Sequence, residues 1–178
     1  APVGTQIGVR LLERNEAKHV SLLNPLSAFL MQSKAVQAFI WELYENELFF
    51  DATERAIIAR YFLPTYLEPD PFLGQSAYVQ KPAFGREGDS VILYEKDGTP
   101  FHKEALQTYA DETAVYQQFD ELPIRKTNTV NGPIHTHYMI GCFCLNGRPS
   151  ALGARAGSMI TNNQSYYLAI GTQKENNS

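Results

Sequence analysis

The sequence lacks three features that would place a protein in a special class: a long apolar run, an excess of positive charge and a signal segment. No apolar run approaches the roughly 20 residues of a membrane span. The formal net charge is −4, so we expect neither nucleic acid nor an anionic membrane to be the main partner. The first ten residues also lack the basic-then-apolar pattern of a secretory signal.

The sequence is also poor in cysteine, with only Cys142 and Cys144. In an expected strand the two would lie on one face with their Cα atoms about 7 Å apart, given roughly 3.3 Å of rise per residue. That separation is at the upper limit for a disulfide. No further cysteine or well-spaced histidine completes a metal site. We therefore predict buried, reduced thiols, which suit a cytoplasmic protein.

The composition present is that of an ordinary soluble protein, because 44% of its 178 residues are hydrophobic and 19% are charged. This length allows one sizeable domain, or two small lobes of about 1–113 and 114–178. The chain begins with Ala1 rather than methionine. We therefore expect it to be part of a longer protein.

The pattern of apolar residues and turn signals predicts helices early in the chain and mostly antiparallel strands after them. This is the α+β class. The expected elements are a strand at 7–12, a short strand at 20–23, helices within 26–44 and 56–62, and strands at 78–81, 90–94, 114–119, 138–145, 150–156 and 165–170; residues 101–109 are a short helix or part of a strand, and 124–136 a loop or turn. The pair Asn146-Gly147 predicts the tight turn of the most secure hairpin.

The first helix places a lysine in a noteworthy position. Ser33 is a suitable N-cap for a regular helix over residues 34–44. Lys34 would then lie in the first turn, where the helix dipole disfavours a cation by roughly a few tenths of a kcal/mol. A bound anion would reverse that local effect. The alternative is a solvated surface lysine on a helix that begins at Pro25.

A second lysine, Lys81, ends a short expected strand and is followed by Pro82, which has no N–H and should stop the pairing. A glycine-containing loop over residues 85–88 separates this strand from the next. Neither a Walker loop nor a dinucleotide fingerprint fits, because each of those opens a helix. One interpretation is a flexible hairpin tip over phosphates, with Lys81 aimed at the same anion. The other is a surface hairpin with an unrelated lysine.

Taken in order, these motifs resemble those of the glutathionylspermidine synthase family, whose members have the ATP-grasp fold. The resemblance runs from about Asn24 to Thr161. It is carried by the segment 26–34 and a helix with Trp41-Glu42-Leu43, then by Tyr78-Val79-Gln80-Lys81-Pro82, Phe84-Gly85-Arg86-Glu87-Gly88, Tyr116-Gln117-Gln118-Phe119 with Leu122-Pro123, and Gly153-Ala154-Arg155. It implies an ATP-grasp-like α+β fold in which a few helices pack on a mostly antiparallel sheet.

The resemblance implies ATP-dependent joining of a carboxylate to an amine through an acyl phosphate, with Mg²⁺ as a second cofactor. In the full-length protein the partners would be a small peptide carboxylate and a polyamine-like amine. The implied roles are phosphate contact by Lys34 and Lys81, a mobile phosphate cover by Gly85, Arg86, Glu87 and Gly88, an adenine-reading hinge by Gln117, Gln118, Phe119 and Leu122, and contact with the transferring phosphoryl group by Arg155. Because Gln117 and Gln118 alternate faces of a strand, at most one of the two side chains is expected to point at the ligand.

The chain departs from the family pattern in two ways. After the arginine the family usually has acidic residues, whereas Ala156-Gly157-Ser158 follow Arg155. The family's magnesium ligands belong upstream of the first phosphate lysine, and they cannot be placed among Glu13, Asn15 and Glu16. We therefore expect a C-terminal, nucleotide-holding portion with its magnesium ligands outside the chain. The alternative is a degenerate ATP-grasp domain that binds a nucleotide or a protein without chemistry.

Overall fold

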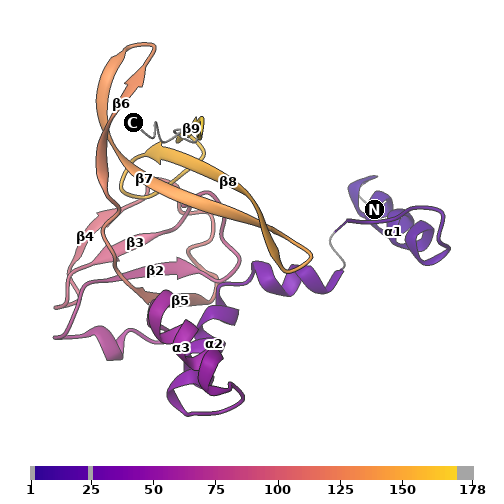
Figure 1. Cartoon of the computed structure of the whole chain (residues 1–178), viewed down its shortest axis with the longest axis horizontal. Helices are drawn as coiled ribbons and strands as arrows, with labels where there is room; N and C mark the ends of the chain where they lie inside the picture. The colour runs from indigo at the N-terminus through magenta and orange to yellow at the C-terminus, as the bar shows by residue number, and fades with distance from the viewer. Residues whose placement is uncertain (1–2, 24–25, 172–178) are drawn as a thin grey trace, which may run out of the picture.

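The computed structural model describes residues 3–23 and 26–171, which form helices followed by two antiparallel sheets (Figure 1). The expected α+β class, with mostly antiparallel sheet, is thereby confirmed. The helical elements are α1 (Val3–Glu16), η1 (Leu26–Gln32), α2 (Ala35–Glu45), α3 (Ala52–Tyr61) and η2 (Asp70–Phe72). The strands are β1 (Thr65–Tyr66), β2 (Tyr78–Pro82), β3 (Ile92–Tyr94), β4 (Pro100–Lys103), β5 (Ala114–Gln118), β6 (Ile124–Thr129), β7 (Gly132–Leu145), β8 (Arg148–Gly157) and β9 (Tyr166–Leu168).

The first sheet has the strand order β1-β5-β2-β3-β4, and the second has the order β6-β7-β8-β9. Helix α2 packs against β1 at the side of the first sheet, where Trp41 Nε1–H donates to the hydroxyl of Tyr66 over 3.1 Å. The second sheet lies beside the first and is reached through residues 119–123 (Figure 1). Because β5 pairs with both β1 and β2, the first sheet includes residues that follow position 113.

The two faces of the first sheet differ in chemistry. One face stacks aromatic rings, with the Tyr78 ring 4.9 Å from that of Tyr94 and 5.5 Å from that of Phe72. The other face carries Val79 and Leu93, which pack with Val91 and with Ile160 from beyond β8. This small apolar core therefore joins the two sheets.

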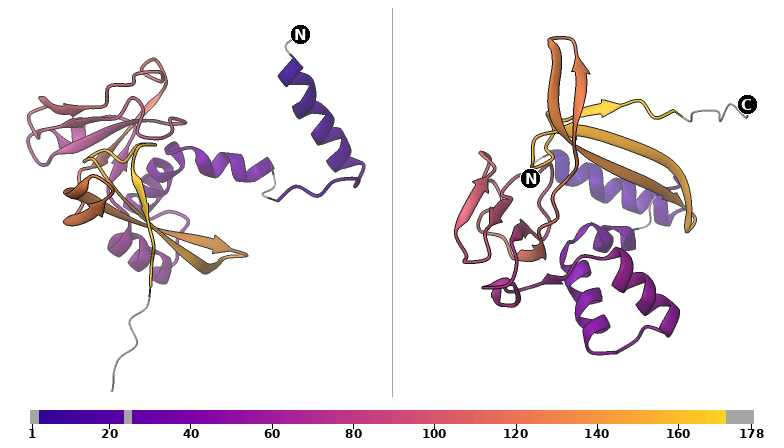
Figure 2. Two further views of the ribbon diagram at one scale, coloured as in Figure 1. Left: turned by 90° about the horizontal axis from the view of Figure 1, so that it is seen from above. Right: turned by 60° about the vertical axis from the view of Figure 1, so that its left-hand side comes forward.

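At the N-terminus the structure differs from the prediction. Residues 7–12 were expected to form a strand, but they lie in α1, which stands away from the rest of the chain in Figure 1 and in the left view of Figure 2. Ile7 and Leu11 satisfy the helical i, i+4 spacing as well as the strand alternation, and Leu12, Glu13 and Arg14 favour a helix. The expected short strand at 20–23 is also wrong, since no strand forms there.

The helix expected within 26–44 is divided in two. The 3₁₀-helix η1 ends at Gln32, and α2 begins at Ala35 with Lys34, not Ser33, at the N-cap position. The Lys34 N–H leaves the helix pattern because it donates to the carbonyl of Ala83 over 2.8 Å. The regular helix is therefore displaced by about one residue from its expected limits.

For the helix expected within 56–62 the sequence offers Asp51 or Thr53 as the N-cap, and the structure has Asp51 there, at the start of α3. The Asp51 carboxylate accepts from the N–H of Glu54 over 2.9 Å, and the Glu54 carboxylate accepts from the N–H of Asp51 over 3.0 Å. This reciprocal capping box satisfies two donors at the helix start.

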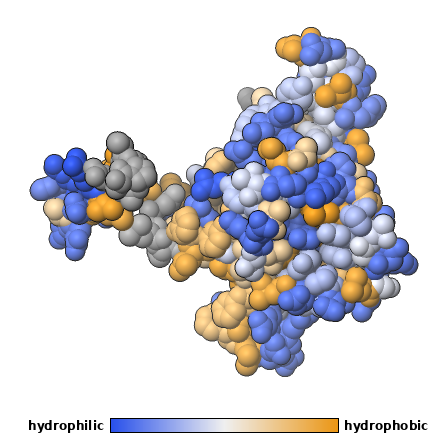
Figure 3. Space-filling model, turned by 180° about the vertical axis from the view of Figure 1, so that it is seen from behind, coloured by the Kyte–Doolittle hydropathy of each residue, from blue (hydrophilic) through white to orange (hydrophobic). Residues whose placement is uncertain are grey.

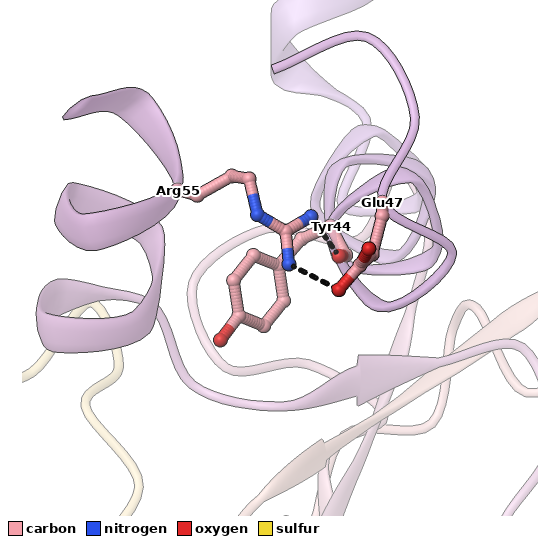
Figure 4. Close-up of polar contacts among 3 residues, drawn as sticks. All are labelled: Tyr44, Glu47 and Arg55. Atoms are coloured by element: carbon pink, nitrogen blue, oxygen red, sulfur yellow. Dashed lines mark hydrogen bonds and ion pairs between the residues drawn. The ribbon is translucent and has the colours of Figure 1, made fainter. Parts of the chain in front are cut away.

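Arg55 fastens α3 to the end of α2 (Figure 4). Its guanidinium donates to the Tyr44 carbonyl over 2.9 Å, pairs with the Glu47 carboxylate at 3.3 Å and lies 5.1 Å from the centre of the Tyr44 ring. The carbonyl contact adds a charged donor to an acceptor at the helix end that also takes the N–H of Glu47 over 3.2 Å. One side chain therefore orders the turn between the two helices.

Strand β2 does not stop at Lys81 as predicted, because Pro82 continues the strand opposite Ala114. Pairing extends further, since the Ala83 N–H donates to the Thr113 carbonyl over 2.8 Å. Alternate N–H groups point to opposite sides of a strand, so the missing N–H of Pro82 is on the β3 side. The β2–β3 ladder has already ended there at Gln80 and Ile92, and a proline is tolerated at such a position.

The second sheet is longer than the sequence suggested. Residues 124–136, expected to be a loop or turn, form β6 and the start of β7. The polar residues there occupy a projecting hairpin, within which the hydroxyls of Thr127 and Tyr138 lie 2.9 Å apart. The Asn146-Gly147 turn between β7 and β8 is confirmed, with positive φ at both residues.

Both cysteines are free, as expected, but the prediction that they are buried is wrong. Cys142 and Cys144 lie in the part of β7 that pairs only with β8. Because none of the described residues forms a further layer over this two-stranded ribbon, side chains on both of its faces are exposed, including Ile140, Phe143 and Leu152.

Apolar surface is also exposed on the helical side of the molecule. In Figure 3 it covers the region of η1 and the end formed by α2 and α3. Phe49 in the turn after α2 is 87% exposed, and Met31 in η1 is 71% exposed. None of the described helices is long and apolar enough to cross a membrane.

Candidate functional site

A pocket of about 470 Å³ lies between the two sheets. Its size is within the range of small-molecule sites. The first sheet contributes Val79, Leu93 and the end of β5, and the second contributes Met139, Arg155 and the segment 159–161. The pocket thus has apolar walls and a small set of charged groups.

Most of the predicted site residues come together here. The pocket is lined by Lys34, Lys81, Glu87, Gly88, Gln117, Gln118, Phe119, Leu122 and Arg155. These residues span more than 120 positions of the sequence. Strand pairing in the first sheet and the position of the second sheet beside it bring them to one cavity. The structure does not place Gly85 and Arg86 at this wall; Arg86 lines a second, polar pocket on the far side of the loop.

Lys81 is held at the base of the pocket by one short contact. Its ammonium donates to Oε1 of Gln117 over 2.6 Å. Burial, and next the charge on Lys34, lower the pKa of Lys81 to about 8. Two cations sharing one cavity, one of them largely desolvated, form a site that favours an anion.

Lys34 reaches the same cavity from the start of α2. Its ammonium donates to the carbonyls of Gly85, over 2.6 Å, and Pro82, over 3.2 Å. Burial lowers the pKa of the Lys34 ammonium, while the carboxylate of Glu112 opposes that shift. Gly85 therefore belongs to the site through its backbone, as a partner of Lys34.

The loop over residues 85–88 is closed against the second sheet at Gly88. Gly88 has φ = +77°, and a Cβ there would lie 2.8 Å from Cγ2 of Ile160 and 2.9 Å from the carbonyl oxygen of Thr161. Its neighbour Glu87 also has positive φ, at 56°. The backbone thus approaches the segment after β8 so closely that only glycine fits.

The far end of the loop is anchored to residues 104–109. The carboxylate of Asp89 accepts from the N–H of Thr108 over 2.9 Å, and the hydroxyl of Ser90 accepts from the N–H of Tyr109 over 2.9 Å. Burial opposes ionisation of Asp89, but the bonds from Thr108 and Ser90 hold the pKa of its carboxyl below the usual value. These bonds therefore fix the end of the loop to the segment 104–109.

The two glutamines of β5 face opposite ways, as the alternation predicted. Gln117 lies opposite Val79 on the pocket face, and Gln118 lies opposite Tyr78 on the aromatic face. Gln118 still lines the pocket, where the strand ends.

Sequence reasoning missed several lining residues of the second sheet and its connections, namely Asp120, Met139, Met159, Ile160 and Thr161. No motif marks them, because their role depends on how the second sheet is placed. It also missed Thr65, which is 1% exposed and bonded to Gln117. Its place in a strand of two residues gives no periodic signal.

Glu87 and Asp120 are the carboxylates at the pocket. Within residues 3–23 and 26–171 no group of three histidine, cysteine, aspartate or glutamate side chains could hold a metal ion. Magnesium ordinarily takes one or two carboxylates together with substrate phosphates and waters.

Known proteins resemble this chain over most of its length. Residues 4–171 match the family described as "Glutathionylspermidine synthase preATP-grasp". A protein of Haemophilus influenzae named "Putative acid--amine ligase" is 28% identical over 162 residues, which make up 85% of this chain and 36% of that protein. The chain thus spans 36% of the length of this curated relative. Because the family match covers nearly all of its length, the chain belongs to the glutathionylspermidine synthase family.

Proposed function

We propose that this chain is the C-terminal, ATP-holding portion of an ATP-grasp-type ligase that joins a carboxylate to an amine. The observation that supports this best is the presence of Lys34, Lys81 and Arg155 at one pocket with apolar walls. Cations suit a triphosphate, and the apolar walls suit a flat base. The name of the Haemophilus influenzae relative, "Putative acid--amine ligase", agrees with this reaction class.

In the proposed reaction a carboxylate oxygen of the acid attacks the γ-phosphorus of ATP, and the bond to the bridging oxygen breaks to release ADP. The amine then attacks the carbonyl carbon of the acyl phosphate and expels inorganic phosphate. Both steps need charge neutralisation and positioning more than covalent help from the protein.

Each pocket residue has a place in this scheme. Lys34 and Lys81 neutralise the phosphates, while the planar guanidinium of Arg155 meets the transferring phosphoryl group from the second sheet. Main-chain groups at the end of β5, next to Phe119 and Leu122, read the adenine edge. The loop at Gly88 covers the phosphates with backbone N–H groups.

The remaining parts of the reaction lie outside this chain in the proposal. Magnesium would accompany ATP with ligands contributed elsewhere in the full-length protein. The acid would be a small peptide carboxylate, and the amine a polyamine-like molecule.

Titration calorimetry with Mg-ATP tests the site. We expect binding by the wild-type chain, loss of the heat in Lys81→Ala, and unchanged binding in Lys126→Ala, which removes an exposed lysine of β6. If Lys81→Ala binds as well as the wild type, the site is assigned wrongly. If the wild type gives no heat, the nucleotide proposal fails.

The second candidate is a binding module that holds a nucleotide or a partner protein without chemistry. The observation in its favour is that Ala156-Gly157-Ser158, and no carboxylate, follow Arg155. ADP release by the full-length parent protein, assayed with peptide carboxylates and polyamines, separates the two. Release that depends on both substrates excludes the binding module.

A further inference from the structure

We infer that Gln117 is a positioning residue for Lys81: its amide oxygen fixes the ammonium at the pocket while leaving the lysine's charge for the ligand. This inference rests on the proposed nucleotide site. It gives the Gln117 side chain a task separate from the one expected of the hinge segment 117–122.

The sheet register places the two side chains together. Gln117 lies directly opposite Thr65 on one side and Val79 on the other, and Lys81 lies opposite Val115, two residues along. Gln117 and Lys81 are therefore diagonal neighbours on one face, within reach of long side chains. The 2.6 Å contact between Oε1 and the ammonium follows from this register.

The orientation of the amide is determined by its other contacts. Its nitrogen donates to the hydroxyl of Thr65 over 3.0 Å and to Oε1 of Gln37 over 3.2 Å. The Thr65 hydroxyl donates its own proton to the carbonyl of Leu63 over 2.9 Å, so towards Gln117 it can only accept. The reversed amide would turn a donor towards Lys81. The hydrogen bonds of the buried Thr65 thus orient the Gln117 amide so that its oxygen faces Lys81.

The neutrality of Gln117 matters because of the charges around it. The other ionisable groups at the pocket are Lys34 from the start of α2, Glu87 from the loop, Asp120 after β5 and Arg155 from β8. A glutamate at position 117 would have nearly the same shape, but its carboxylate would pair with Lys81 and reduce the attraction for a phosphate. An amide accepts the same hydrogen bond without cancelling the charge.

The test follows the titration of the Lys81 side chain by NMR in the wild-type chain, Gln117→Glu and Gln117→Leu, all without nucleotide, with the signal assigned by Lys81→Arg. We expect a wild-type midpoint near 8. In Gln117→Glu a carboxylate within about 4 Å should raise the Lys81 midpoint by about 1 pH unit or more. In Gln117→Leu the loss of the hydrogen-bond acceptor should lower this midpoint. The matched control Gln75→Glu makes the same charge change at an exposed loop position and should leave the midpoint in place.

A second readout is the Mg-ATP affinity at pH 7, which should fall about tenfold or more in Gln117→Glu although Lys81 stays fully charged. General loosening of the fold would not move the Lys81 midpoints of Gln117→Glu and Gln117→Leu in opposite directions. The inference is overturned if Gln117→Glu leaves the titration midpoint of Lys81 unchanged, or if Gln117→Leu raises that midpoint. If Gln117→Glu does not fold, the direction of the midpoint shift in Gln117→Leu decides. A wild-type chain that binds no Mg-ATP would overturn the proposed function instead, whatever the titrations give.

Discussion

Among single residues, Lys81 couples the site to pH most directly. Its pKa of about 8 in the folded chain lies below the ordinary value of 10.5 because burial and Lys34 disfavour the charge. Phosphates favour the charged form, so binding of Mg-ATP should take up protons near pH 8. We expect the affinity to be greatest below pH 8 and to fall by up to about tenfold per pH unit above it. Calorimetry in buffers of different ionisation enthalpy measures both quantities.

The same shift predicts the opposite pH dependence for stability. Between pH 8 and 10.5 the unfolded chain binds more protons at this position than the folded chain does, so the free energy of unfolding should rise across that window. The contribution of Lys81 is roughly 3 kcal/mol at most. Urea unfolding at pH 7.5 and 9.5 measures it, and Lys81→Met should remove this part of the rise. A rise of the same size in Lys81→Met would show that other groups cause it.

Within the elements, the loop over the pocket is the part most sensitive to a single methyl group. Gly88→Ala would strain a positive φ, at roughly 1–2 kcal/mol, and would also push against Ile160 and the Thr161 carbonyl. Gly74 offers a matched control, because its φ is +75° and a Cβ there meets nothing within 4 Å. We expect both variants to lose stability in urea and only Gly88→Ala to bind Mg-ATP more weakly. Equal binding by the two would mean that the loop does not contact the nucleotide.

The connection between α2 and α3 should depend more on a carbonyl contact than on its ion pair. The Glu47 side chain is 79% exposed, so Glu47→Gln should lose less than about 1 kcal/mol. Arg55→Ala also removes the charged donor from the Tyr44 carbonyl, which keeps the N–H of Glu47 at 3.2 Å, and should lose roughly 1–3 kcal/mol. Arg60→Ala, which removes an arginine on the same helix lying over the ring of Tyr61, serves as the control. Thermal unfolding ranks the three, and an equal loss in Glu47→Gln and Arg55→Ala would assign the effect to the ion pair.

The elements show where sequence reasoning succeeds. Three predictions that depend on neighbouring residues alone are confirmed. They are Asp51 at the cap of α3, the Asn146-Gly147 turn, and the strands on either side of the glycine loop. The apolar pattern of residues 7–12 fits either period, so it could not exclude α1. The polar hairpin formed by β6 and the start of β7 buries threonines, Thr127 and Thr136, so it shows no apolar alternation. The wall formed by Met139 and residues 159–161 depends on the packing of two sheets, which no local pattern specifies.

At the scale of the whole molecule, the chain holds one part of the proposed reaction. It spans 36% of the length of its Haemophilus influenzae relative. We therefore predict that the isolated chain binds Mg-ATP weakly and forms no product with peptide carboxylates and polyamines. Phosphate release and mass spectrometry of the products measure this, with the full-length parent as the positive control. ATP- and amine-dependent ligation by the isolated chain would contradict the prediction.

The pocket lies on the seam between the two sheets, and this location has a mechanical consequence. A molecule held by Lys81 on one side and Arg155 on the other binds only while the sheets stay in register with each other. By mass action such a molecule stabilises the docked arrangement, by about 2.7 kcal/mol at a hundredfold excess over its dissociation constant. Bound nucleotide would thus hold the two sheets together. The two sheets should then unfold in one thermal transition with nucleotide, even if they unfold in two transitions without it.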